Sequence, residues 1–120
     1  MTRRILIAED EMVVAFDLCE TVEEAGFEVE GPHSGIASAA DACDNARPDV
    51  AILDVELRDG NIFSFAEKLR EKLVPVIFHS GSLSAQEVVD RFPDATVLMK
   101  PCPPADMLNA VNHAVQPAAA

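Results

Sequence analysis

Residues 50–54 decide the fold, because Val50-Ala51-Ile52-Leu53-Asp54 is an unbroken apolar run of strand length that ends in an acid. Three further blocks of this kind are Ile5 to Ala8, Val74 to Phe78 and Thr96 to Met99. Continuous apolar runs indicate strands that are buried on both faces. A fifth block, Phe27 to Gly31, alternates with glutamates and predicts a strand nearer the edge of the sheet.

Segments with helical spacing of apolar residues separate these blocks. One such stripe consists of Ile62, Ala66, Leu69 and Leu73. Ser84-Ala85-Gln86-Glu87 has the pattern of a capping box, and Pro103-Pro104 suits the first turn of a last helix. Five alternations of strand and helix require a parallel sheet with helices on both faces. We therefore predict an α/β fold, a doubly wound parallel sheet of five strands in the flavodoxin-like order 2-1-3-4-5.

Composition predicts one globular domain over residues 1–116, followed by a disordered tail at 117–120. Nine Lys and Arg against 21 Asp and Glu give a net charge of -12, which repels nucleic acid and anionic membranes. No apolar run approaches the length of a membrane span, so we expect a cytoplasmic protein. The cysteines, Cys19, Cys43 and Cys102, are too scattered for a disulfide framework or a zinc site, and two of them fall on helix core faces.

The ends of the predicted strands carry the candidate functional residues. Ligands of open parallel sheets bind outside the carboxyl ends of the strands, where the strand order reverses. The first strand ends in Glu9 and Asp10, the third in Asp54, the fourth in Ser80 and the fifth in Lys100. The sequence therefore predicts that three acids, a hydroxyl and an amine converge at one crevice.

Three crowded acids raise one another's pKa unless a cation shares their site. Mg²⁺ is the natural choice, because it prefers oxygen ligands, and Asp10 and Asp54 would bind it directly. A carboxylate can also attack phosphorus, and the central Asp54 is the candidate for an aspartyl phosphate. Lys100 and Ser80 would each take one phosphoryl oxygen. The sequence has no glycine-rich phosphate loop and no Ser-His-Asp signature, so nucleotide hydrolysis and acyl transfer have no support.

Each of these residues has an ordinary structural interpretation when it is taken alone. An acid after a strand is more often a turn or cap residue, and Lys100 alone would be a solvated lysine. Only their combination at four strand ends favours a functional site. The histidines are interpreted structurally: His79 as a buried, hydrogen-bonded residue that points away from Ser80, and His33 and His113 as surface residues.

Taken together, these motifs resemble the receiver domain of bacterial two-component response regulators, especially the single-domain type. The resemblance covers nearly the whole chain, and the combined set of motifs is specific. The matching segments are Ile5-Leu6-Ile7-Ala8-Glu9-Asp10-Glu11, Val50-Ala51-Ile52-Leu53-Asp54-Val55, Val74-Pro75-Val76-Ile77-Phe78-His79-Ser80-Gly81 and Val97-Leu98-Met99-Lys100-Pro101.

This resemblance implies a role for each site residue. Asp54 would accept a phosphoryl group from a phosphohistidine on a sensor histidine kinase or a histidine phosphotransfer protein. Lys100 would pair with a phosphoryl oxygen, and Ser80 would move toward the phosphoryl group. The resemblance also implies a cis peptide bond between Lys100 and Pro101.

The implied metal site holds Mg²⁺. By resemblance, Asp10 and Asp54 are direct ligands, Glu9 acts through water, and the backbone carbonyl of Glu56 is the third protein ligand.

The sequence departs from the family pattern at three places. The loop that follows the acceptor, residues 55–60, is shortened, and Glu56 adds an acid where many relatives are neutral. Val97 stands where many receivers carry Tyr or Phe, and Gly81 stands where alanine is frequent. We expect signalling to reorganise the Gly81 loop and the helix from Ser84 to Arg91 without a change of aromatic rotamer.

The predicted function is that of a stand-alone phosphorylation switch that signals to a downstream protein, and not that of an enzyme. A piece of a larger regulator is the other interpretation of the short chain. Two further alternatives belong to other functional classes: a phosphorylation-independent docking module, and a small phosphohydrolase with an aspartyl-phosphate intermediate.

Overall fold

The computed structural model describes residues 2–81 and 85–116. The predicted disordered tail and Ser84 of the predicted capping box lie outside these residues. No helix within the described ranges is long and apolar enough to cross a membrane. The elements in chain order are β1 (Arg4–Ala8), α1 (Met12–Glu24), β2 (Glu28–His33), α2 (Ile36–Asn45), β3 (Val50–Asp54), α3 (Ile62–Glu71), β4 (Val76–Ser80), α4 (Ala85–Arg91), β5 (Thr96–Met99) and α5 (Pro104–Val115).

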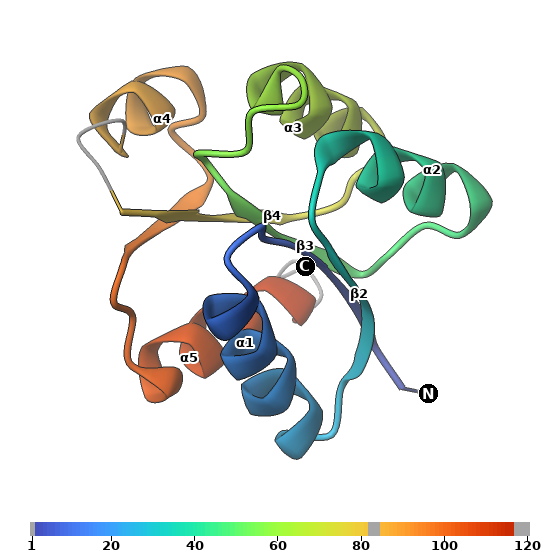
Figure 1. Cartoon of the computed structure of the whole chain (residues 1–120), viewed down its shortest axis with the longest axis vertical. Coiled ribbons are helices and arrows are strands. Elements are labelled where there is room, and N and C mark those ends of the chain that lie inside the picture. The colour runs from blue at the N-terminus through green and yellow to red at the C-terminus, as the bar shows by residue number, and fades with distance from the viewer. Residues whose placement is uncertain (1, 82–84, 117–120) are drawn as a thin grey trace.

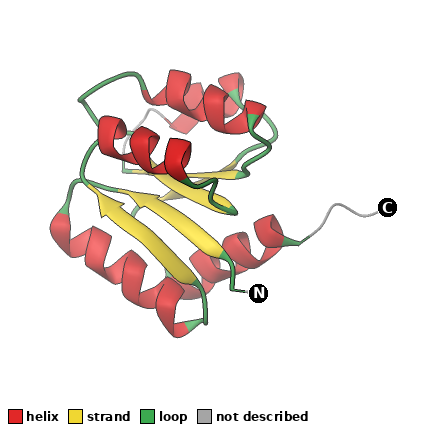
Figure 2. Ribbon diagram, turned by 90° about the vertical axis from the view of Figure 1, so that its right-hand side faces the viewer, coloured by secondary structure: helices red, strands yellow, loops and turns green. Residues whose placement is uncertain are grey.

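The strands form one parallel sheet in the order β2-β1-β3-β4-β5, which confirms the predicted topology. Helices α1 and α5 cover one face of this sheet, and α2, α3 and α4 cover the other (Figure 1). The ribbon turned by a quarter shows the same three layers, with the sheet between the two groups of helices (Figure 2). β1 and β3 therefore run through the middle of the molecule.

Two apolar cores lie on the two faces of the sheet. Ile5 and Ile7 of β1 pack into the core beneath α1 and α5. Leu6 and Ala8 of the same strand pack into the core beneath α2, α3 and α4. Successive side chains of a strand point to opposite faces, and here both faces are covered. This explains why these strands are apolar at every position.

The fourth strand lies two residues later than predicted, at Val76–Ser80 and not at Val74 to Phe78. The Val74 amide donates to the Leu69 carbonyl at the end of α3, and Pro75 has no amide to donate. The predicted stripe on α3 also ends early, because Leu73 lies beyond the helix with a φ of 62° and an exposed fraction of 79%. The chain leaves α3 at this point and enters the sheet only after the proline.

The second strand is at the edge of the sheet, as predicted, and extends past the cis peptide bond between Gly31 and Pro32. The prediction that His33 is a surface residue was wrong. Its Nε2 lies 3.0 Å from Glu30 Oε2 and its Nδ1 lies 3.0 Å from Ser38 Oγ, so both ring nitrogens have hydrogen-bond partners. The residue is half-buried. His113 is exposed, and the helical thiols Cys19 and Cys43 are buried, as predicted.

An aromatic cluster joins β4 to α3 and α4. The ring of Phe92 lies 5.4 Å from that of Phe78 and 6.0 Å from that of Phe63, measured between centroids. Two guanidinium groups cover this cluster: Arg91 Cζ lies 4.7 Å from the Phe63 centroid and Arg70 Cζ lies 5.9 Å from that of Phe92. We call these five residues the α3–α4 aromatic cluster.

Candidate functional site

The parallel register brings the predicted site residues together at the carboxyl ends of the strands. Ala8 of β1 is paired with Leu53 of β3, so the acids that follow them, Glu9 and Asp54, are neighbours. On the other side of β3, the Lys100 amide donates to the Ser80 carbonyl at 2.8 Å. Four strand ends therefore contribute to one site, as the sequence predicted.

Three acids lie within a few ångströms at this end of the sheet, and we call Glu9, Asp10 and Asp54 the acidic rim. Each offers a carboxylate oxygen within 4.8 Å of the others. Glu9 and Asp54 are 1% and 2% exposed, whereas Asp10 is open to solvent. Such a group of buried like charges is unfavourable unless positive charge compensates it.

The environment of Asp54 favours its neutral form. Burial, helped by the adjacent Glu56 and Glu9 carboxyls, raises the pKa of Asp54 from 3.8 to about 8. The Glu56 amide donates to Asp54 Oδ1 at 2.9 Å and acts in the opposite direction. When no metal ion is bound, burial beside two further acids therefore disfavours the ionised form of Asp54.

Lys100 provides positive charge against these acids. Its Nζ lies 3.0 Å from Glu9 Oε1 and 3.4 Å from Asp54 Oδ1. Burial opposes the charged amine, but the contacts with Glu9 and Asp54 outweigh this effect and raise the pKa of Lys100. Glu9 Oε1 meets Lys100 as an ion pair and accepts no hydrogen bond from the described residues.

The donor set fits a hard divalent cation. Three carboxylates lie together, and two of them contact one ammonium group. A buried carboxylate oxygen, Glu9 Oε1, has no hydrogen-bond donor among the described residues. Oxygen ligands of this kind suit Mg²⁺, which also keeps several waters and so tolerates the exposed Asp10. The acidic rim thus has the composition that the sequence predicted for a metal site.

The side chain of Glu56 takes part in the site through contacts that the sequence did not predict. Ser80 Oγ and the Gly81 amide both donate to Glu56 Oε1, at 3.3 and 3.0 Å. The sequence assigned Glu56 a backbone role, through its carbonyl, and singled out its side chain as an added acid beside the acceptor, without placing that side chain against any residue. The available signal was the extra acid two residues after Asp54, but its contact with the end of β4 depends on how the intervening loop folds.

His79 is buried and points away from Ser80, as predicted, but it is not hydrogen bonded as predicted. Neither ring nitrogen has a hydrogen-bond partner among the described residues, and Nδ1 lies 3.9 Å from Glu9 Oε1. Burial, together with the charge of Lys100, lowers the pKa of His79. The ring is therefore neutral at neutral pH.

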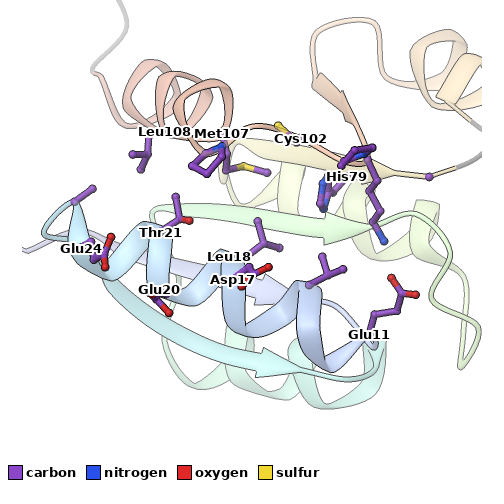
Figure 3. A pocket seen from close by; sticks show the side chains of 16 residues that line it. Glu11, Asp17, Leu18, Glu20, Thr21, Glu24, His79, Cys102, Met107 and Leu108 are labelled. Atoms are coloured by element: carbon purple, nitrogen blue, oxygen red, sulfur yellow. The ribbon is translucent and has the colours of Figure 1, made fainter.

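The ring of His79 faces a groove of about 740 Å³ between α1 and α5 (Figure 3). The groove extends from the site residue Lys100 along the two helices. Its apolar part includes Leu18 and Met107. The acids that line it are Glu11, Asp17, Glu20 and Glu24. An acidic groove therefore adjoins the site, and the sequence alone did not predict it.

Two family-based expectations concern β5. The peptide bond between Lys100 and Pro101 is cis, as the resemblance implied. Val97 packs against the core beneath α2, α3 and α4 and is partly buried. It brings no aromatic ring to this position.

Comparison with known proteins agrees with this geometry. The family model of the response regulator receiver domain matches residues 5–112. The chain belongs to this family. Receiver domains are signalling switches of two-component systems, which bind Mg²⁺ at an acidic pocket and interact with histidine kinases or phosphotransfer proteins.

Two relatives are regulators from Mycobacterium tuberculosis and Methylorubrum extorquens. The chain is 33% identical over 118 residues to the transcriptional regulatory protein PdtaR of Mycobacterium tuberculosis, covering 94% of this chain and 57% of the relative. It is 30% identical to the phyllosphere-induced regulator PhyR of Methylorubrum extorquens, covering 96% of this chain and 44% of the relative. The chain thus spans about half the length of these curated relatives.

Solved structures of receiver domains superpose closely on this chain. A response regulator receiver protein from Sinorhizobium medicae has a TM-score of 0.86 at 28% identity, covering 95% of this chain and 94% of that one. The non-phosphorylated HemR receiver domain of Leptospira biflexa has a TM-score of 0.84 at 28% identity, covering 99% and 98%. The fold is that of the receiver domain throughout.

Proposed function

We propose that this receiver domain accepts a phosphoryl group on Asp54 and acts as a phosphorylation switch. The observation that carries the proposal is the position of Lys100 Nζ, 3.4 Å from Asp54 Oδ1 and 3.0 Å from Glu9 Oε1. A carboxylate flanked by an amine and by a set of metal-ligating oxygens has the groups that phosphoryl transfer needs. The donor is a phosphohistidine on a sensor histidine kinase or a histidine phosphotransfer protein.

The transfer is a displacement at phosphorus. A carboxylate oxygen of Asp54 forms the new bond to phosphorus while the bond from phosphorus to the donor's histidine nitrogen breaks. The electron pair of that bond remains on the donor's imidazole. Lys100 neutralises charge on the phosphoryl oxygens, and the Ser80 hydroxyl donates a hydrogen bond to one of them.

The residues that would hold Mg²⁺ are Asp10 and Asp54 as direct ligands, Glu9 through water, and Glu56 through its backbone carbonyl. When bound, Mg²⁺ would offset the repulsion within the acidic rim and keep Asp54 ionised. The rim itself supports this assignment, because its carboxylates lie close together and two of them are buried.

The signal then leaves the site through the end of β4. Ser80 and Gly81 lie at this end, and the chain continues toward α4. We expect this segment to rearrange without the movement of an aromatic ring, because Val97 provides none at the neighbouring position of β5. The rearranged surface would be recognised by a downstream protein in the cytoplasm.

The test is phosphorylation by acetyl phosphate in the presence of Mg²⁺, followed by intact mass. We expect the protein to gain one phosphoryl group, and to lose this gain without Mg²⁺ or in Asp54→Ala. Asp41→Ala is the matched control, because Asp41 is an exposed acid on α2 and should leave the gain intact.

A short-lived phosphoryl group would escape detection by mass, so beryllofluoride provides a second measurement. It mimics a phosphoryl group on a carboxylate and should perturb the amide NMR signals of the residues around Asp54. If neither acetyl phosphate nor beryllofluoride had any effect on the wild-type protein, phosphorylation-independent docking would replace the present proposal.

A further inference from the structure

One carboxylate oxygen of Glu56 holds the end of β4. Ser80 Oγ donates to Glu56 Oε1 at 3.3 Å, and the Gly81 amide donates to the same atom at 3.0 Å. Ser80 is completely buried, so its hydroxyl is held inside the site and not in solvent. Hydrogen bonds to an ionised acceptor are stronger than neutral ones, which makes this contact a specific restraint on the turn.

Glu56 is also attached directly to the phosphorylation site. It follows Asp54 by two residues, and its amide donates to Asp54 Oδ1 at 2.9 Å. A charge added to Asp54 is therefore added next to the Glu56 carboxylate. Like charges at this range repel, and a phosphoryl group brings oxygens that are themselves strong acceptors.

We propose that Glu56 is a positioning residue that holds the Ser80–Gly81 turn before phosphorylation, and that the phosphoryl group on Asp54 displaces it from this turn. The inference rests on the proposed function of Asp54. Ser80 Oγ and the Gly81 amide exchange one anionic acceptor, the Glu56 carboxylate, for another, the phosphoryl group. The Glu56 carboxylate then moves away from the turn.

This exchange makes Glu56 a competitor of the phosphoryl group. The two acceptors claim the same donors, so the free energy of the Glu56 contacts is subtracted from that of phosphoryl binding. Removal of the carboxylate should therefore strengthen the binding of a phosphoryl mimic. A residue that merely supported the turn would have the opposite effect, because its loss would disorder the donors.

The test compares the wild-type chain with Glu56→Ala and Glu56→Gln by amide NMR, titrating beryllofluoride at constant Mg²⁺. Without beryllofluoride, the Gly81 amide proton of Glu56→Ala should move upfield, since it has lost a carboxylate acceptor. With beryllofluoride bound, wild type and variant should give the same Gly81 signal. We expect the affinity of Glu56→Ala for beryllofluoride to rise about tenfold, the effect of removing hydrogen bonds to a charged acceptor.

One further variant separates hydrogen bonding from charge, and a second is a control. Glu56→Gln keeps an acceptor oxygen without the charge, so its gain in affinity should be smaller than that of Glu56→Ala. Glu11→Ala removes one exposed acid that lines the neighbouring groove, and it should leave the Gly81 signal in place.

Two results would overturn the inference while leaving the proposed function intact. One is a Gly81 signal that is the same in wild type and Glu56→Ala before beryllofluoride is added. The other is an affinity of Glu56→Ala that equals or falls below that of wild type. If the wild-type protein did not respond to beryllofluoride at all, the proposed function would fail as well.

Discussion

The acidic rim and the α3–α4 aromatic cluster adjoin the same sheet and have opposite effects on stability. The rim buries Glu9 and Asp54 side by side, so that the ionisation of both carboxyls is unfavourable in a poorly solvated place. The cluster buries Phe78 against neighbouring rings and covers them with guanidinium groups. The comparison teaches that packing around the cluster stabilises the domain, whereas the burial of neighbouring acids in the rim lowers its stability.

β4 connects the two regions. Phe78 and Ser80 are two residues apart, so their side chains leave the strand on the same face, toward α3 and α4. His79 lies between them and faces the groove between α1 and α5 (Figure 3). The aromatic cluster thus fixes the strand that presents Ser80 to the site.

The largest effect is expected for Phe78→Ala, which would break the aromatic cluster. Phe78 is fully buried, and its removal leaves a cavity, so the free energy of unfolding should fall by about 3 to 5 kcal/mol. Urea denaturation followed by circular dichroism measures this change. Phe63→Ala is the control, because Phe63 belongs to the same cluster but is only partly buried. Its free energy of unfolding should fall clearly less. Equal losses would contradict the central place of Phe78.

An effect of opposite sign is expected for Asp54→Asn in the metal-free protein. The folded protein, with the pKa of Asp54 near 8, holds a proton that the unfolded chain, with a pKa of 3.8, has already released. The free energy of unfolding of the wild type should therefore fall as pH rises between these values. Asp54→Asn removes this decline and should be more stable than the wild type near pH 8, by more than about 1.4 kcal/mol, the free energy of a tenfold change in proton affinity.

The same denaturation series, with a chelator present at about pH 5 and about pH 8, measures the pH dependence. The advantage of Asp54→Asn should be smaller at the lower pH, and Mg²⁺ should reduce it at the higher pH by stabilising the wild type. Asp41→Asn tests the charge change alone, on the exposed surface of α2. A stability difference that is independent of pH would show that the rim does not shift the pKa of Asp54.

The smallest effect is expected for Arg91→Ala, which tests how much a guanidinium group adds to the stability of the cluster. The guanidinium lies over the ring of Phe63, and an exposed contact of this kind is worth about 0.5 to 1 kcal/mol. Arg91 also pairs with Glu87 at 3.3 Å, where both side chains are largely exposed. Glu87→Ala removes only that ion pair and should cost less than Arg91→Ala. If Glu87→Ala lost more free energy of unfolding than Arg91→Ala, the ion pair and not the contact with the Phe63 ring would provide the stabilisation.

Apolar patterning made most of the fold predictable. Runs such as Val50 to Leu53 are buried at every position because helices cover both faces of the sheet. The errors fell at ends of elements, where the pattern is ambiguous. Val74 is apolar and buried, yet its amide closes the end of α3, and the apolar Leu73 is exposed beyond that helix. Hydrophobicity does not distinguish a strand residue from an apolar residue in a tight connection.

For the site, the sequence determined which chemical groups stand at the strand ends. Glu9, Asp54, Ser80 and Lys100 follow from strand ends and chain order, because parallel strands align their carboxyl ends at one edge. The sequence could also show that Glu56 adds an acid next to Asp54.

Only the tertiary structure decided which atoms meet. It placed the Glu56 carboxylate against Ser80 and Gly81, left the His79 ring without a hydrogen bond among the described residues, and opened a groove between α1 and α5. These features depend on segments that are far apart in sequence, and on the conformation of loops and the rotamers of side chains. Spacing along the chain fixes the period of a strand or helix but not the direction of a side chain in a loop, so packing decides such contacts.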